Sequence, residues 1–433
     1  MNTQDLLQQL TSANLGRLKE NGLYRKFVAI QHDRVNFPVG IHIDSGKPAI
    51  DFASSDYLGL SVSDVTVEAA ISAVQNNGVG SGGSHNLGGR YPELEELEIL
   101  LANQHSKGGA LLFNSGYAAN IGILGSLSLL FKGKNPIFFS DEWNHRSIIE
   151  PLRSQEKRIY SHNDIKDLEA KLAEANHTKP DSPKIIVFEG LYSMDGSVPN
   201  IKAIADLAKK YGAIIIDDEV HAVGMYGKNA CGICEEQGVL ADIDIIVGGF
   251  GKAHGSTGGY VVGTRELVDY TRSFCPEFIF TSSSNHPTIS ASLAATKYLM
   301  TNPPERQQHK ENVARLKRLF EENGVPFADF SGHIIPVMIG DAETAKDIAS
   351  DMLEKHGVFV RAAFFPSVPA GQARLRIIPN ARHTEEHLQQ LASGLREVLI
   401  EYGIIQIGQA MINELEKQGN IPQEERKPDA VHR

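Results

Sequence analysis

Seven short predicted strands, most of them apolar, alternate with predicted helices between residues 110 and 262. The predicted strands are 110–113, 136–139, 157–160, 184–188, 213–217, 244–247 and 259–262. Runs without alternating polar positions are typical of strands that are buried on both faces, and strands separated by helices pair in parallel. The pattern therefore predicts an α/β fold, with a large, mostly parallel sheet covered by helices on both faces.

The rest of the chain predicts smaller units around this sheet. Residues 3–29 carry leucines at helical spacing and predict an amphipathic N-terminal arm, and residues 41–52 predict a hairpin around Asp44-Ser45-Gly46. Further helices are predicted at 264–274, 286–301, 304–323, 342–356 and 384–402, and further strands near 334–338, 358–361 and 373–377. The last group predicts a small C-terminal α+β domain.

A chain of 433 residues is too long for one core, so we expect several domains. The predicted divisions are an arm with hairpin at 1–60, a large domain at 61–300, a small domain at 301–402 and a tail at 403–433. The tail is charged and poor in apolar residues, so we expect it to be disordered.

Charge, cysteine content and the distribution of apolar residues argue against several classes of protein. The net charge of −11 and the absence of a basic stripe argue against a nucleic-acid surface. Three cysteines favour a reducing compartment over a disulfide framework. The N-terminus lacks the basic start and apolar run of a signal peptide, and polar residues interrupt the most apolar stretch, 109–131. We therefore expect a cytoplasmic protein without a membrane partner.

Ionisable residues follow two neighbouring predicted strands. Asp218 lies at the end of 213–217, and Lys252 lies in a glycine-rich loop after 244–247. Ligands bind outside the carboxyl ends of strands in open parallel sheets, so an acid and a lysine can converge there on one small molecule. Pyridoxal phosphate (PLP) needs this pair: the lysine binds its aldehyde, and the carboxylate keeps its ring nitrogen protonated.

Two motifs around these residues resemble those of the α-oxoamine synthases, which use PLP to condense an amino acid with an acyl-CoA. They are D-E-V-H-A-V-G-M-Y-G at 218–227 and G-K-A-x-G-x-x-G-G-Y at 251–260. The resemblance runs from about residue 4 to about residue 402 and is closest to the 5-aminolevulinate synthases. It implies the type I fold of PLP-dependent transferases, a homodimer with sites at the subunit interface, and glycine and succinyl-CoA as substrates for tetrapyrrole biosynthesis.

The resemblance also implies a role for each cofactor-binding residue. Lys252 holds the aldehyde, Asp218 the ring nitrogen and His221 the phenolic oxygen, while His145 stacks on the ring. The turn Ser115-Gly116-Tyr117 opens a predicted helix, where free backbone N–H groups suit a phosphate. Ser193 reaches the substrate, and Thr281 and Ser282 reach the phosphate from the partner subunit.

For the substrates, the resemblance assigns the amino-acid carboxylate to Arg376, a suitable bidentate partner. Arg374 is expected to be a surface residue on an edge strand. The residues implied on the acyl-CoA side are Arg25, Ser84, Asn86, Ser140, Lys157 and, in the lid at 364–371, Ser367. Arg25 favours succinyl-CoA, because a fatty acyl chain offers a buried cation no partner.

Two positions depart from the family pattern. Ser55 stands where an asparagine usually helps to hold the amino acid, and Gly249 stands where a phosphate-binding threonine is usual. A hydroxyl offers one donor where an amide offers two. The alternative is therefore another α-oxoamine synthase that uses alanine, serine or a different acyl donor. A catalytically silent partner subunit is the remote alternative.

Three further patterns are given no chemical role. The G-x-G-x-x-G match at 78–83 lacks the flanking strand and helix of a dinucleotide site, and we interpret it as a flexible loop. The C-x-x-C match at Cys231 and Cys234 has no second pair, so no metal is expected there. Asp217 is interpreted as a solvated or capping acid.

Overall fold

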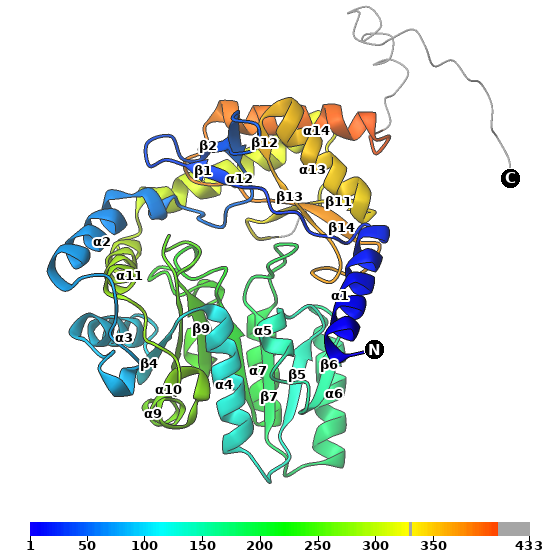
Figure 1. Cartoon of the computed structure of the whole chain (residues 1–433). Helices are drawn as coiled ribbons and strands as arrows, with labels where there is room; N and C mark the ends of the chain where they lie inside the picture. Colours follow the sequence, from blue (N-terminus) through cyan, green and yellow to red (C-terminus); the bar gives the residue numbers. More distant parts are fainter. Residues whose placement is uncertain (329–330, 406–433) are drawn as a thin grey trace, which may run out of the picture.

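The computed structural model describes residues 1–328 and 331–405 (Figure 1). Its central sheet has seven strands in the order β4-β10-β9-β8-β7-β5-β6. The strands are β4 Gly109–Phe113, β5 Ile137–Asp141, β6 Glu156–Tyr160, β7 Lys184–Glu189, β8 Ala213–Asp218, β9 Ile245–Gly249 and β10 Gly259–Gly263. Strand β10 is antiparallel to both of its neighbours, and the other pairs are parallel. The predicted mostly parallel sheet is confirmed.

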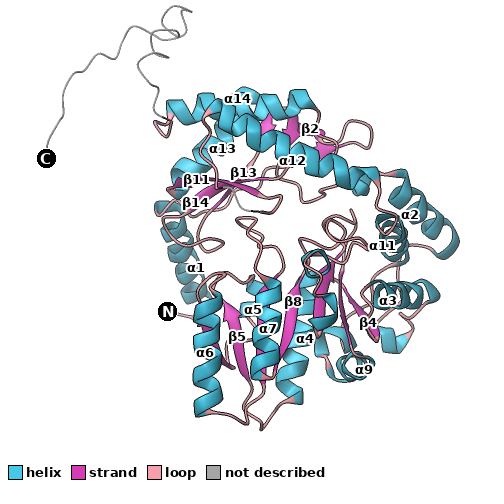
Figure 2. Ribbon diagram, turned by 180° about the vertical axis from the view of Figure 1, so that it is seen from behind, coloured by secondary structure: helices cyan, strands magenta, loops and turns pink. Residues whose placement is uncertain are grey.

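Helices cover both faces of this sheet (Figure 2). One face packs on α3 Pro92–Gln104, α6 Ile165–Thr178, α7 Ile201–Tyr211 and α11 His286–Leu299. The other packs on α4 Gly116–Leu130, α5 Arg146–Ile149, α9 Arg265–Phe274 and α10 Pro276–Ile279. In β7, Ile186 and Phe188 enter the first core, whereas Ile185 and Val187 enter the second. Burial on both faces is why the run is apolar throughout.

A second group of elements lies apart from the large sheet (Figure 2). Its three-stranded sheet has the order β11-β14-β13. The elements are β11 Ile335–Gly340, β13 Arg361–Ala363 and β14 Ala373–Ile377, with helices α12 Pro304–Asn323, α13 Ala342–His356 and α14 Glu385–Glu401. The prediction of one strand at 358–361 is wrong, because the chain there divides into β12 Val358–Phe359 and β13, which join different sheets.

The N-terminal hairpin packs with the C-terminal elements. Strands β1 Ile30–His32, β2 Val39–His42 and β3 Pro48–Asp51 form a four-stranded sheet with β12, which pairs in parallel with β3. Ile50 and Phe52 are buried in the same core as Leu391 of α14. The hairpin is thus as predicted, but its packing partners come from the other end of the chain. The domain divisions at residues 60, 300 and 402 remain predictions.

The remaining elements are α1 Thr3–Glu20, α2 Asp64–Asn77, α8 Ile233–Glu236 and the short helices Leu60–Val62, His85–Leu87 and Leu240–Asp242. Helix α1 forms as the leucine spacing predicts, but none of its residues is buried. Within the described ranges, no helix is both long and apolar enough to cross a membrane. Most of the predicted tail, from residue 406 onward, lies outside the described residues.

Candidate active site

The carboxyl ends of β8 and β9 open onto a cavity of about 250 Å³. Strand β8 ends at Asp218, and the loop between β9 and β10 supplies Lys252. The predicted site residues that line this cavity together are Ser115, Gly116, Tyr117, His145, Asp218, His221 and Lys252. The sequence-based expectation that the acid and the lysine converge is therefore met.

The amine of Lys252 is set up to react near neutral pH. Burial, followed by the positive charge of Arg376, lowers its pKa to about 8, while Asp218 opposes the shift. At pH 7 roughly 300-fold more of this amine is unprotonated than for a lysine of ordinary pKa. An unprotonated amine is the form that attacks an aldehyde or removes a proton.

This lowered pKa predicts how the cofactor-free protein captures PLP. The capture rate is expected to rise about tenfold per pH unit below pH 8 and to level off above it, because only the unprotonated amine reacts. Stopped-flow absorption at a series of pH values measures this. In Arg376→Gln the midpoint moves upward, since a positive charge is removed. A wild-type midpoint near pH 10 would contradict the expectation.

Asp218 is buried and held by two donors. Asn120 Nδ2 donates to Oδ2 at 2.6 Å, and the backbone N–H of Val220 donates to Oδ1 at 3.0 Å. Burial raises the carboxyl pKa, while these hydrogen bonds and the positive charges of His145 and Lys252 act in the opposite direction. A fixed, desolvated carboxyl is suited to share a proton with a basic ring nitrogen.

His145 is fixed at the start of α5. Its Nδ1 lies 2.8 Å from Ser147 Oγ, and its backbone N–H donates to Glu189 Oε1 at 2.6 Å. Burial lowers the pKa of the imidazole, which favours the neutral ring. Tyr117 meets this ring edge-on, with centroids 6.2 Å apart. A neutral ring in a fixed orientation is suited to stack on an aromatic ligand.

His221 and Arg376 approach the site from different parts of the fold. Nδ1 of His221 lies 2.6 Å from the hydroxyl of Tyr57, and burial keeps the imidazole pKa well below its usual value. Arg376 Nε donates to the backbone oxygen of Ser193 at 2.6 Å. Tyr57 also lies close to Arg376 and to Ser55. Arg376 thus lies next to Ser193, and the substrate-binding roles that the resemblance implies for both residues remain predictions.

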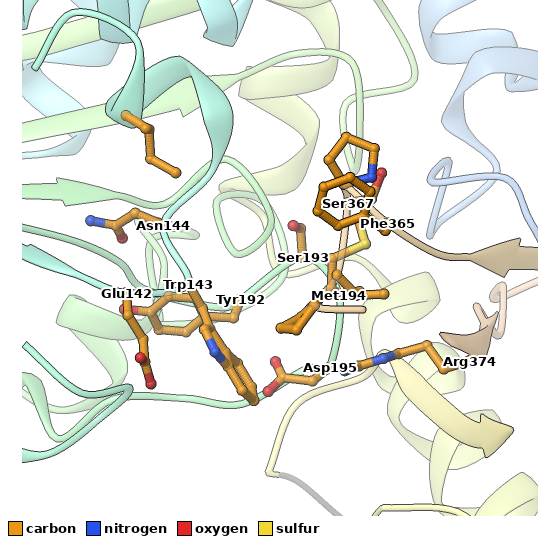
Figure 3. Close-up of a pocket in the computed structure, with 14 residues that line it drawn as sticks. Glu142, Trp143, Asn144, Tyr192, Ser193, Met194, Asp195, Phe365, Ser367 and Arg374 are labelled. Atoms are coloured by element: carbon orange, nitrogen blue, oxygen red, sulfur yellow. The ribbon is translucent and has the colours of Figure 1, made fainter. Parts of the chain in front are cut away.

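A second cavity of about 250 Å³, here called the lid pocket, lies between residues 142–144, residues 192–195 and lid residues 365–369 (Figure 3). Ser193 and Ser367 both line it. So does Arg374, which is only 2% exposed, and the prediction of a surface arginine is wrong. The reason is that β14 is the central strand of its sheet rather than an edge strand.

Arg25 meets the lid. Its NH2 group donates to Ser367 Oγ at 3.2 Å, and its guanidinium lies over the ring of Phe364, 4.9 Å from the centroid. The arm that carries Arg25 is therefore joined to the lid by a polar contact and a cation–π contact.

The other predicted substrate and phosphate residues do not line the Lys252 cavity. Ser84 pairs with Ser282 in an isolated bridge, next to exposed Asn86 and half-buried Thr281. Their roles across a subunit interface remain predictions, as do those of Ser140 and Lys157, which are described next.

Ser140 and Lys157 are bonded within the chain. Ser140 Oγ accepts a hydrogen bond from Asn144 Nδ2 at 2.9 Å. The amine of Lys157 donates to the backbone oxygens of Leu152 at 2.9 Å and Arg153 at 3.2 Å. An acyl-CoA would have to share or replace these bonds.

Three residues of the site were not predicted from the sequence: Tyr57, Asn120 and Glu189. Asn120 lies one helical turn after Gly116, so its place on the same face of α4 was foreseeable. Glu189 ends β7 directly beside Asp218, where the rule of strand ends also applies. Tyr57 carries no local signal, because its partner His221 is 164 positions away in sequence.

Asp217 corrects another expectation. Its side chain is fully buried, although a solvated or capping acid was predicted. Neither carboxylate oxygen has a hydrogen-bond partner among the described residues, and burial raises its pKa well above the usual range. Asp217 lies just before the motif at 218–227, so the resemblance assigns it no role.

The start of α4 is shaped to receive an anion. Ser115 Oγ caps the helix by accepting from the backbone N–H of Ala118 at 3.0 Å, and Gly116 and Tyr117 follow at the cavity wall. Gly259 of β10 lies against this turn: a Cβ there would come within 2.5 Å of Gly116 N. The residues present therefore fit a phosphate at a helix N-terminus.

Gly259→Ala tests this fit. The added methyl group must displace the turn at residues 115–116, so we expect weaker binding of PLP and a loss of about 1–3 kcal/mol in the free energy of unfolding. PLP titration and denaturant unfolding measure the two effects. The control is Gly125→Ala in α4, where a Cβ meets nothing within 4 Å and a small gain in stability is expected. Equal PLP affinity in both variants would contradict the proposed turn.

Comparisons with known proteins agree with this geometry. The family model for aminotransferase class I and II matches residues 47–395. The chain is 41% identical to the 5-aminolevulinate synthase of Rickettsia felis over 395 residues, which cover 91% of this chain and 94% of that protein. It is 39% identical to the 5-aminolevulinate synthase of Bradyrhizobium diazoefficiens over 400 residues, covering 92% and 97%.

Solved structures are similar as well. Serine palmitoyltransferase from S. paucimobilis, determined with bound PLP, has 28% sequence identity and a TM-score of 0.84, covering 94% of this chain and 100% of that one. The 8-amino-7-oxononanoate synthase of Francisella tularensis shares the fold, with 24% identity and a TM-score of 0.68, covering 82% and 99%.

Proposed function

Because the chain belongs to the class I and II aminotransferases and, within them, to the α-oxoamine synthase family, we propose that it condenses glycine with succinyl-CoA, using PLP and giving 5-aminolevulinate, CoA and CO2. The convergence of Lys252, Asp218, His145 and His221 on one buried cavity supports the PLP chemistry most directly. The identity to 5-aminolevulinate synthases over nearly their whole length supports the choice of substrates.

The residues present fit PLP. Lys252 would hold the aldehyde, Asp218 the ring nitrogen, and the turn at 115–117 the phosphate. When bound, PLP supplies an electron sink that stabilises negative charge at the α-carbon of the amino acid. His145, fixed by Ser147 and Glu189, presents its ring to the cavity, and His221 is oriented there by Tyr57.

Lys252 is the general base of the proposed reaction. Its lowered pKa leaves a usable fraction of free amine at neutral pH, so it can remove a proton from the α-carbon of glycine and later return one to the product. The partly buried guanidinium of Arg376, fixed by the backbone of Ser193, would hold the glycine carboxylate nearby. Burial lowers the pKa of both groups.

Arg25 would select the acyl donor. It already contacts Ser367 of the lid, so a succinyl carboxylate bound there would draw the arm and the lid together. A fatty acyl chain would leave the guanidinium without an anionic partner, which costs free energy once the lid excludes water. The preference for succinyl-CoA is therefore expected to depend on this arginine.

The proposal is tested by measuring CoA release from glycine, alanine and serine against acetyl-, succinyl-, octanoyl- and palmitoyl-CoA. We expect glycine with succinyl-CoA to be preferred. In Arg25→Leu, kcat/KM for succinyl-CoA is expected to fall roughly 10- to 100-fold, as for the loss of a charged hydrogen-bonded pair, while octanoyl-CoA is affected less. Arg17→Leu in the exposed helix α1 is the matched control and should leave the preference unchanged.

Ser55 favours a second candidate, an α-oxoamine synthase for another amino acid. It lies close to Tyr57, beside Arg376, and is smaller than the asparagine usual there. If alanine or serine gives the higher kcat/KM while succinyl-CoA is inert, the named reaction is wrong, and Ser55→Asn becomes the variant expected to restore glycine.

We also propose a homodimer, in which Thr281, Ser282, Ser84 and Asn86 would serve the partner's site, and a cytoplasmic location. Exposed apolar side chains near these residues, Leu87 and Phe280, each 82% exposed, support an interface there. Light scattering of the purified protein measures the oligomeric state.

A further inference from the structure

Strand β8 directs alternate side chains to its two faces. Asp218 faces Asn120 of α4, so Asp217 and Glu219 face the opposite side, toward residues 231–234. There they meet Cys234, and all three side chains are fully buried. Their ligand atoms, two carboxylate oxygens and a sulfur, lie within 4.8 Å of one another. Three groups that bind metals are thus collected directly behind the cofactor-binding carboxylate.

The hydrogen bonds of this cluster are incomplete. Glu219 Oε1 accepts from the backbone N–H of Cys234 at 2.6 Å, and Oε2 accepts from that of Ile233 at 2.9 Å. Asp217, in contrast, receives no N–H or hydroxyl hydrogen bond at either oxygen among the described residues, and its neighbouring carboxyl, Glu219, can bond to it only if one of the two holds a proton. A buried pair of carboxylates without a counter-charge is costly, so either a shared proton or a bound cation must complete its interactions.

The charges around Asp217 point to a cation. The charged neighbours that act on its carboxyl are Glu219 and Asp218, and both are acidic. The backbone hydrogen bonds to Glu219 come from neutral N–H groups, and its side-chain neighbours are the Cys234 thiol and the Asp217 carboxyl, neither of which carries a positive charge. Asp218 lies on the other face, where Asn120 Nδ2 donates a hydrogen bond to it. The two carboxylates of the cluster therefore have no positive partner of their own among the described residues.

The backbone around the cluster is closed. A Cβ at Gly190 would come within 2.5 Å of Glu219 Oε2, and one at Gly232 within 2.4 Å. Only glycine at these positions lets the chain pack so closely around the carboxylate. The cluster supplies three protein ligands, so the fourth position of a tetrahedral metal would be completed by a water or by a backbone oxygen.

We propose that Asp217, Glu219 and Cys234 bind one divalent transition-metal ion, with Zn²⁺ as the best fit. A thiolate selects zinc over magnesium or calcium, which prefer oxygen ligands alone. Zinc lies about 2.3 Å from sulfur and about 2.0–2.2 Å from carboxylate oxygen, so a small contraction of the cluster encloses it. The metal ties β8 to the loop at 231–234 and stiffens the wall that carries Asp218.

Cys231 is not a ligand, although it completes the C-x-x-C motif with Cys234. Its sulfur donates to the backbone oxygen of Gln104 at 3.1 Å, away from the cluster. The motif thus supplies one ligand, and strand β8 supplies the other two. The proposed site therefore needs no second cysteine pair, which is the usual sequence signature of a zinc site.

The test uses the full-length, PLP-loaded protein dialysed against Zn²⁺, with bound metal measured by mass spectrometry. We expect one Zn²⁺ per chain and a rise in Tm on binding. In Asp217→Asn and Cys234→Ala, the affinity is expected to fall by roughly 100-fold or more, since even residues that only support ligands matter 10- to 100-fold. Cys275→Ala is the matched control, because this thiol is also buried but bonds to Glu277. The visible absorption of bound PLP checks that each variant is folded.

A Co²⁺-substituted protein provides a second readout. Tetrahedral Co²⁺ with a thiolate ligand absorbs in the red, apart from bound PLP, and this band should vanish in Cys234→Ala and persist in Cys275→Ala. Two results overturn the proposal. One is Zn²⁺ bound equally by wild type and both ligand variants, which places the ion elsewhere. The other is the absence of stoichiometric Zn²⁺ in the wild type, and a higher Tm for Asp217→Asn would then show that Asp217 and Glu219 share a proton instead.

Discussion

The Lys252→Ala variant is expected to release CoA from glycine and succinyl-CoA at least about 10⁴-fold more slowly than the wild type. The substitution removes both the amine that binds the aldehyde and the general base, and a general base alone contributes about 10²- to 10⁴-fold. The lowered pKa of Lys252 and its place in the wall of the cavity assign both roles to this one side chain. The rate of CoA release and the visible absorption of the PLP-loaded protein measure the two losses separately.

The matched control for this variant is Lys202→Ala, in the exposed part of α7, which should retain wild-type activity and absorption. Added methylamine distinguishes loss of chemistry from loss of structure, because a small amine can enter the space left by the lysine and restore part of the rate. A Lys252→Ala protein with more than a few per cent of wild-type activity would show that another residue is the base.

Asp218→Asn is expected to lower kcat by roughly 10²- to 10³-fold. An amide cannot share a proton with the ring nitrogen, so the electron sink is weakened while the shape of the site is kept. Asn120 and the backbone of Val220, which hold the carboxylate at 2.6 and 3.0 Å, remain in place. Single-turnover CoA release measures the chemical step, and PLP titration measures whether the cofactor still binds.

Two further variants make this result specific. Asp218→Glu keeps the charge and is expected to retain more activity than Asp218→Asn, whereas Asp206→Asn on the exposed face of α7 should have no effect. If Asp218→Asn and Asp218→Glu lose activity equally, shape rather than charge is what matters at this position, and the proton-sharing role is wrong.

Local patterns in the sequence were sufficient to predict much of the fold. The seven strands of the large sheet lie where the sequence predicts them, and burial on both faces leaves a continuous apolar signal in the inner strands such as β7, although not in the edge strand β6. Helix α12 and its neighbours follow from apolar spacing near 3.6 residues. The site residues carried by motifs at strand ends, Lys252, Asp218, His145 and His221, meet in one cavity for the same reason: the strand order places their ends side by side.

Contacts between segments far apart in the chain determine the strand partners and the burial that the sequence did not predict. Strand β12 pairs with β3 across some 300 residues, which separates it from β13 although the two are nearly adjacent in sequence. Arg374 is buried because β14 is the middle strand of its sheet, and strand order has no signature within a single strand.

The sequence alone thus determined most of the secondary structure, the mostly parallel sheet and the site residues that lie in motifs, because each depends on a period or spacing within one segment. Only the tertiary structure decided that Tyr57 orients His221, that Arg25 meets the lid, and that Asp217 is buried against Glu219 and Cys234. Such contacts join segments far apart in the chain, and they arise from burial and charge in the folded interior rather than from any local pattern.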